Sequence, residues 1–282
     1  MIIKRLLFVI FLFSVFFVSP SFTFAVKTLP KEPIKILLVP GHDNEVWGSQ
    51  YGNLKEADMN LILATKIYNL LKKDKRFKVW ITRNSIGYNK EFSDYFTLNK
   101  ENIISFKENA KKKNEEEITN GNFIEKVNVQ HNITSPEMAI KLYGINKWAN
   151  GNKIDAVIHI HFNDYPRENK WTKGIYRGFN IYMPEAQMTN SKESTRLAKS
   201  IFSQLSKKYA ISTYEKEKEG LTPDQSLIAL GSKGTLLESV RSILIEYGYI
   251  YRFGNNNVRK NAYVNMTNLT VKGIKNYFFN NK

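Results

Sequence analysis

The sequence predicts an α/β fold in which a mainly parallel, twisted sheet is flanked by helices on both faces. Short apolar runs that would bury both sides of a strand alternate with segments of helical periodicity, a pattern typical of parallel sheets. The chain has 282 residues and is 42% hydrophobic, which is enough for one large domain. We therefore expect a single domain over residues 26–282 with one inserted segment.

The first strand and the first helix are the clearest elements. Residues 34–39 form a continuous apolar run that ends at Pro40-Gly41, which predicts a central strand. Residues 56–73 carry apolar side chains at three- and four-residue spacing and end in two lysines, which predicts a helix. A second strand is expected at 77–82.

The later part of the chain continues this alternation. A helix is expected at 135–151, because Ser135 suits the N-cap and Pro136 suits the first turn. The other expected elements are strands at 156–161, 179–183, 226–230 and 243–246 and helices at 191–209 and 258–279.

Residues 84–134 interrupt the pattern because they show no sustained period. A stretch of this length without structure of its own is uncommon inside a compact domain. We interpret it as an inserted loop or hairpin that gates or widens a binding groove and is not needed for folding.

The N-terminus indicates the compartment. Lys4 and Arg5 precede an almost unbroken apolar run at 6–18, and small residues follow up to Ala25. This order predicts a secretory signal peptide over residues 1–25, with an uncleaved membrane anchor as the alternative. Either alternative places the domain outside the cytoplasm, in the periplasm, outside the cell or at the cell wall.

Composition restricts the partners and the chemistry. Lys and Arg outnumber Asp and Glu by 42 to 26, which gives a net charge of +16 and favours anionic envelope polymers. Export, and the lack of a basic patch interleaved with aromatic residues, argue against nucleic acid. The sequence has no cysteine, so any metal must be held by His, Asp and Glu.

Candidate polar groups gather at the C-terminal ends of the expected strands. His42 follows the first strand, His161 ends the strand at 156–161, Glu246 ends a late strand, and Glu56 opens the first helix. Ligands bind at this edge of parallel sheets. Two imidazoles and a carboxylate are the ligand set of a catalytic zinc that keeps a fourth position open.

Four segments, taken in order, carry a family resemblance. They are Ile36–Arg83 with Pro40-Gly41-His42 and Lys55-Glu56-Ala57-Asp58, His159–Asn163, Ser191–Leu205, and Leu244–Ile250. In this order they resemble the zinc-dependent N-acetylmuramoyl-L-alanine amidases, over residues 34–83 and 135–279. The departures are Asp43-Asn44-Glu45 where the family usually has glycines, Ile145 where it has an arginine, and Arg252 where an asparagine is common.

The resemblance implies zinc-dependent hydrolysis of the amide bond between N-acetylmuramic acid and L-alanine in peptidoglycan. It implies His42, Glu56 and His161 as zinc ligands and Glu246 as the catalytic carboxylate. The residues themselves give an independent reason for the last role, because an ionised carboxylate in the apolar strand around Glu246 would be costly without a partner.

Some assignments stay open on the residues alone. His159 and His161 lie two apart on one strand and face the same side, so either could reach a metal. The position nearer the strand end favours His161 and leaves His159 behind the ligands or in the core. Asn163 could position substrate or ligands. The reserve ligands are Asp58 and Asp43, and His131 is expected at the surface.

Two other functions compete with this interpretation. A non-catalytic envelope-binding protein on the same fold would be expected to lack a metal ligand or Glu246, and all four residues are present. A zinc peptidase acting on a peptide bond would use the same ligand set. The expected partner is peptidoglycan, with anionic envelope polymers as a second possibility, and the sequence identifies no protein activator.

Overall fold

The computed structural model describes residues 32–126 and 134–280, so the expected signal peptide and His131 lie outside the described residues. A six-stranded sheet has the order β4-β1-β5-β8-β6-β7, and a separate two-stranded hairpin pairs β2 with β3. The strands are β1 (Ile34–Pro40), β2 (Gln50–Tyr51), β3 (Leu54–Lys55), β4 (Phe77–Ile81), β5 (Ala156–Asn163), β6 (Asn180–Pro184), β7 (Leu221–Asp224) and β8 (Arg241–Tyr249).

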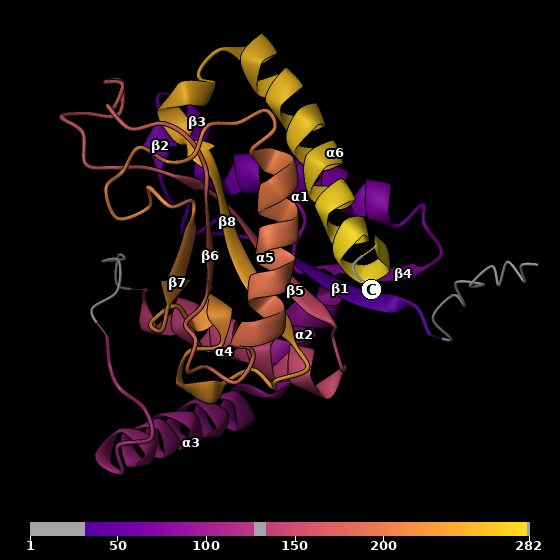
Figure 1. Ribbon diagram of the computed structural model, residues 1–282, viewed down its shortest axis with the longest axis vertical. Helices are drawn as coiled ribbons and strands as arrows, with labels where there is room; N and C mark the ends of the chain where they lie inside the picture. The colour runs from indigo at the N-terminus through magenta and orange to yellow at the C-terminus, as the bar shows by residue number, and fades with distance from the viewer. Residues whose placement is uncertain (1–31, 127–133, 281–282) are drawn as a thin grey trace, which may run out of the picture.

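The strand directions define the edge at which a ligand can bind. β4, β1, β5 and β8 are parallel, whereas β6 is antiparallel to β8 and carries β7 parallel to itself. The ends of β1, β5 and β8 therefore lie together, and we call this the C-terminal edge. In Figure 1, β8 points from the centre of the molecule toward the β2–β3 hairpin at this edge.

Helices cover both faces of the sheet, which confirms the predicted fold class (Figure 1). Alternate residues of β1 separate the two cores. Ile36 and Leu38 pack with the first group of helices, and Leu37 and Val39 pack with the second. The first group is α1 (Glu56–Leu71), α5 (Ser191–Leu205) and α6 (Asn256–Asn280), and the second is α2 (Lys90–Leu98) and α4 (Pro136–Gly151).

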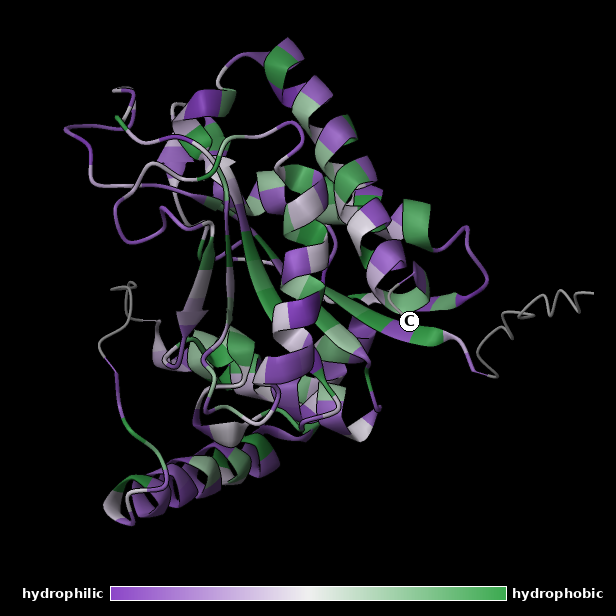
Figure 2. Ribbon diagram, viewed as in Figure 1, coloured by the Kyte–Doolittle hydropathy of each residue, from purple (hydrophilic) through white to green (hydrophobic). Residues whose placement is uncertain are grey.

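The inserted segment was wrongly interpreted as a loop or hairpin. It contains α2 and a further helix, α3 (Lys100–Thr119). Asn89 caps α2 by accepting a hydrogen bond from the Phe92 amide, and Phe92 is fully buried against Trp148 of α4. Most of α3 is polar, as Figure 2 shows, and among its described residues only Ile103 is buried, so the helix gives almost no apolar period.

Most of the described insertion lies away from the C-terminal edge. Beyond α3, the backbone amides of Ile124 and Lys126 bond to the side chains of Gln187 and Gln225. Gln187 follows the end of β6, which is antiparallel, and so lies at the opposite edge of the sheet. Within the described part, residues 84–89 and the start of α2 lie at the C-terminal edge, where Asn44 donates to the carbonyls of Ser85 and Ile86 and Asn89 donates to the Ile81 carbonyl.

Phe92→Ala is expected to lower the free energy of unfolding by about 3–5 kcal/mol, because it empties a buried aromatic site. Chemical denaturation of the purified domain measures this directly. Leu98→Ala is the matched control, because Leu98 lies on the same helix and is 81% exposed. Equal stability of the two variants would restore the interpretation of the insertion as dispensable for folding.

One expected strand was also wrong. Residues 226–230 form a 3-10 turn at Ile228–Leu230, whereas the strand lies earlier, at β7. The Asp224 carboxylate accepts hydrogen bonds from the amides of Ser226 and Leu227, which turns the chain away from the sheet. β7 was missed because it contains Pro223, and a proline argues against a strand in a sequence. Pro223 is tolerated here because β7 is an edge strand.

Candidate metal centre and active site

Three donor side chains meet at the C-terminal edge. His42 lies in the loop after β1, Glu56 is the first residue of α1, and His161 lies near the end of β5. One ligand atom from each lies within 4.8 Å of the others. Glu56 stands between the two imidazoles, with Oε2 3.2 Å from His42 Nε2 and Oε1 3.0 Å from His161 Nδ1. The structure thus brings together the three residues that the sequence predicted as a metal centre.

Two glycines allow this close approach. A Cβ atom at Gly41 would collide with the His161 ring. A Cβ atom at Gly48 would collide with the His42 ring and lie 2.6 Å from Glu56 Oε2, and Gly48 also has a φ of +69°. Any side chain at either position would therefore displace a member of the cluster.

The charges of the cluster suit a divalent cation. Burial alone would raise the pKa of Glu56, but His42 and His161 hold it well below its usual value, so the carboxylate is ionised. Burial lowers the pKa of His161 despite the Glu56 carboxylate, so this imidazole is neutral. For His42, burial acts against Glu56, and the net effect raises its pKa. An anionic oxygen between two imidazoles fits zinc.

Arg83 fixes the two segments that carry His42 and Glu56. Its buried guanidinium donates to the carbonyls of Pro40 at 3.2 Å, of Gly41 at 3.1 Å and of Ala57 at 2.7 Å. These carbonyls flank the two side chains in the chain. His42 itself has a φ of 61°, a conformation uncommon outside glycine, and Arg83 holds the backbone just before it.

Asn60 adds a second constraint one turn into α1. Its Nδ2 donates to the Gly41 carbonyl at 3.0 Å and to Glu56 Oε1 at 3.3 Å. The Ser49 amide donates to the other carboxylate oxygen, Oε2, at 2.9 Å. The orientation of Glu56 is therefore set by the protein before any ion binds.

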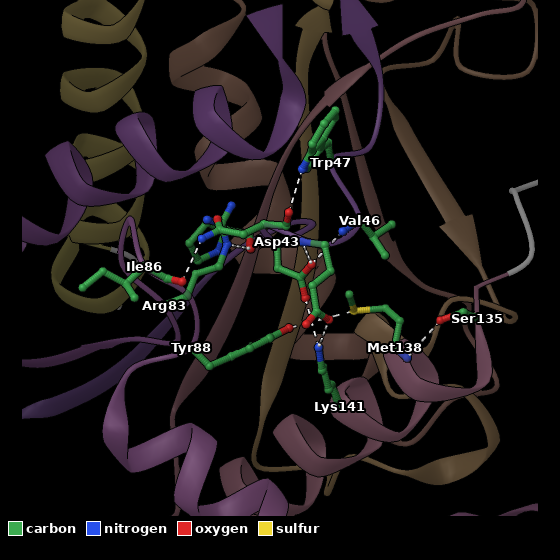
Figure 3. A network of polar contacts seen from close by, with 12 residues as sticks. Asp43, Val46, Trp47, Arg83, Ile86, Tyr88, Ser135, Met138 and Lys141 are labelled. Carbon is green, nitrogen blue, oxygen red and sulfur yellow. Dashed lines mark hydrogen bonds and ion pairs between the residues drawn. The ribbon is translucent and has the colours of Figure 1, made fainter.

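The loop after His42 is pinned to α4, and this removes the two reserve ligands. Figure 3 shows Asp43 accepting from the Val46 amide and pairing with Lys141 of α4, at 2.9 Å and 3.1 Å. The Lys141 ammonium also lies over the Tyr88 ring. Asp43 is therefore committed to this network, and Asp58 is exposed on α1, so neither belongs to the metal-ligand cluster.

Glu246 lies beside the cluster on the neighbouring strand. Its Cα is the register partner of His161 across the β5–β8 ladder. Its Oε2 is buried and has no hydrogen-bond partner among the described residues. Burial raises the pKa of Glu246 well above its ordinary value, and the charges of Glu56 and Glu217 act in the same direction. Such a carboxyl group is suited to exchanging protons.

His159 belongs to the core. Its side chain is buried, and its ring bonds to the backbone of Ala229. Burial, with a smaller contribution from His161, lowers its pKa to about 3, so the ring is neutral. The sequence analysis favoured His161 over His159 as the ligand because His161 is nearer the end of the strand. The burial of His159 in the core agrees with that choice.

Asn163 points to a residue that the sequence analysis missed. Its Nδ2 donates to Glu217 Oε1 at 2.9 Å, and Glu217 is buried. Glu217 lies in the run Glu215-Lys216-Glu217-Lys218-Glu219, which reads as a solvated surface segment. The alternating charges gave no signal that the middle residue turns inward.

Comparisons with known proteins identify the family of the chain. The sequence profile of the N-acetylmuramoyl-L-alanine amidases matches residues 36–276. The chain belongs to this family, whose members are peptidoglycan amidases. A search of curated protein sequences gave no match.

Solved structures share the fold. They include the CwlD amidase of Clostridioides difficile in complex with the GerS lipoprotein, with a TM-score of 0.56 and 15% identity over 88% of this chain and 100% of that chain. The Ami1 amidase of Mycobacterium abscessus has a TM-score of 0.53 and 14% identity over 87% and 99% of the two chains. The AmiC2 amidase of Nostoc punctiforme has a TM-score of 0.52 and 16% identity, over 86% of this chain and 96% of that chain.

Proposed function

We propose that this chain holds zinc through His42, Glu56 and His161 and hydrolyses the amide bond between N-acetylmuramic acid and L-alanine. Membership of the amidase family supports the reaction. The observation that carries the proposal is the preformed His–Glu–His cluster next to the half-buried Glu246, whose Oε2 is buried without a partner among the described residues and whose pKa is raised.

The residues divide the work of the reaction. Zinc at the cluster would supply Lewis-acid chemistry, polarising the amide carbonyl and lowering the pKa of water toward neutrality. Glu246 Oε2, which has no protein partner in the described residues, accepts the proton from the attacking water. The same oxygen then returns the proton to the nitrogen of the leaving L-alanine, so Glu246 acts first as base and then as acid.

Export is part of the proposal, because peptidoglycan lies outside the cytoplasmic membrane. Residues 1–25 carry the expected signal, and the excess of 42 basic over 26 acidic residues suits an anionic envelope. Within residues 32–126 and 134–280, no helix is both long and apolar enough to cross a bilayer.

Digestion of purified peptidoglycan, followed by mass analysis, tests the proposed function. We expect free glycan strands together with intact stem peptides, and we expect this release to stop when a chelator removes the metal and to return with added zinc. Trimmed stem peptides would instead indicate a zinc peptidase. Binding without any cleavage would indicate a non-catalytic envelope protein, and either result would reject the proposal.

A further inference from the structure

Glu217 is a buried carboxylate with an unusually complete set of hydrogen bonds. It lies in the loop between α5 and β7 and is 2% exposed. Oε1 accepts from Asn163 Nδ2 at 2.9 Å and from the Tyr182 hydroxyl at 2.5 Å. Oε2 accepts from the Ser212 hydroxyl at 2.6 Å and from the Tyr249 hydroxyl at 3.2 Å. All four donors are uncharged.

Three of the four donors come from three adjacent strands of the sheet. Asn163 is the last residue of β5, Tyr182 lies on β6, and Tyr249 is the last residue of β8. Asn163 and Tyr249 are register partners just beyond an irregularity in the β5–β8 ladder. The Glu217 carboxylate therefore joins three adjacent strands at the point where the backbone ladder becomes irregular.

The same strands carry the reacting groups. Asn163 follows His161 by two residues on β5, and Tyr249 follows Glu246 by three on β8. A shift between these strand ends would change the distance between the metal ligand and the proton-transfer group. Because catalysis is sensitive to misplacements of about 1 Å, such a shift would cost turnover.

We propose that Glu217 is a positioning residue that holds the strand of His161 and the strand of Glu246 at the spacing required for hydrolysis. This inference rests on the proposed amidase function. Glu217 acts through Asn163 and Tyr249 and does not itself touch the metal cluster, whose described members are His42, Glu56 and His161.

Two substitutions separate the hydrogen-bond network from the charge. Glu217→Gln can keep the network, because its amide oxygen can accept from Asn163 and Tyr182 while its NH2 group donates to hydroxyls that rotate to accept. Glu217→Leu has a similar size and removes all four bonds.

The matched control is Glu185→Leu. Glu185 is also buried, lies just beyond the other end of β6, and accepts hydrogen bonds from Gln187 and Gln225. It therefore reports what the loss of a bonded buried carboxylate does to the fold far from the C-terminal edge.

The measurements are kcat and KM on a soluble muropeptide, zinc content and melting temperature. We expect Glu217→Leu to lose at least about tenfold in kcat, with KM within about threefold and zinc retained. Glu217→Gln should restore kcat to within about threefold of the parent, and Glu185→Leu should lose melting temperature but not kcat.

The inference is overturned if Glu217→Leu keeps its kcat, or if Glu185→Leu loses as much. If Glu217→Leu does not fold, the double variant Ser212→Ala/Tyr249→Phe removes both bonds to Oε2 and must show the same selective loss of kcat. A parent protein that cleaves no amide would reject the proposed function itself, which is a separate result from an active parent with an unaffected variant.

Discussion

Glu246→Gln is expected to reduce kcat by about 10²-fold or more while zinc stays bound, because the variant keeps the size of the side chain but cannot accept a proton. Turnover of peptidoglycan and zinc content, measured on the same preparation, check this. If zinc is lost together with activity, Glu246 is a ligand. Near-normal hydrolysis would reject the proposed role of Glu246.

The same variant has an expected effect on stability in the zinc-free protein. The pKa of Glu246 is raised by burial, then by Glu56 and Glu217, so the folded state holds this proton more tightly than the unfolded state does. The free energy of unfolding of the parent should therefore fall as pH rises above about 4.3, the ordinary pKa of Glu. Glutamine has no such charge. At pH 7 the melting temperature of Glu246→Gln should therefore equal or exceed that of the parent. The two melting temperatures should converge below about pH 4.

Glu185→Gln is the control, because the pKa of Glu185 is shifted in the opposite direction to that of Glu246. Burial would raise the pKa of Glu185, but Lys126 and nearby amides lower it to about 2. Its ionised form therefore stabilises the fold above pH 4, and this contribution disappears as pH falls toward 2. At pH 7, Glu185→Gln should melt below the parent and keep its activity. A drop in melting temperature for Glu246→Gln as well would indicate that Glu246 is a structural carboxylate.

The elements that the sequence predicted well are those whose signal is local. The apolar run at 34–39 and the capped helix at 135–151 appear as β1 and α4 with nearly the same bounds. The metal cluster was predictable because strand-end residues of a parallel sheet converge whatever the details of packing. Correct strand assignments therefore placed His42 and His161 at one edge, whereas the choice of Glu56 as the third ligand came from the resemblance to the amidases.

The features that were missed depend on tertiary contacts. α3 has charged residues on most of its faces, so no apolar stripe marks it as a helix. The charged residues on either side of Glu217 are typical of a solvated surface segment, and only the fold brings Asn163 and Tyr249 to its carboxylate. Arg83 was recognised as part of a motif, but its bonds to backbone carbonyls from two segments could not be read from residue types.

His161→Ala is expected to lower zinc affinity by at least about 100-fold, whereas His159→Ala should keep zinc and lose stability instead. The two histidines lie on the same strand and face, so the pair is a matched comparison of position alone. His161 Nδ1 lies 3.0 Å from Glu56 Oε1, and the His159 ring is buried and bonds to the backbone of Ala229. Competition with a chromophoric chelator gives the affinity, and thermal melts of the zinc-free chains give the stability.

The pH dependence of zinc binding to the parent sharpens this comparison. The pKa of His42 is raised mainly because Glu56 outweighs burial, so a proton competes with the metal at this ligand as pH falls. Zinc affinity should therefore begin to decline at a pH above the ordinary His pKa of about 6.5 and should fall further below it. In His159→Ala the decline should follow the parent, because His159 is already neutral and its proton does not compete. If His159→Ala releases zinc and His161→Ala retains it, the ligand on β5 is His159. The metal would then lie two residues farther from the end of β5 than proposed.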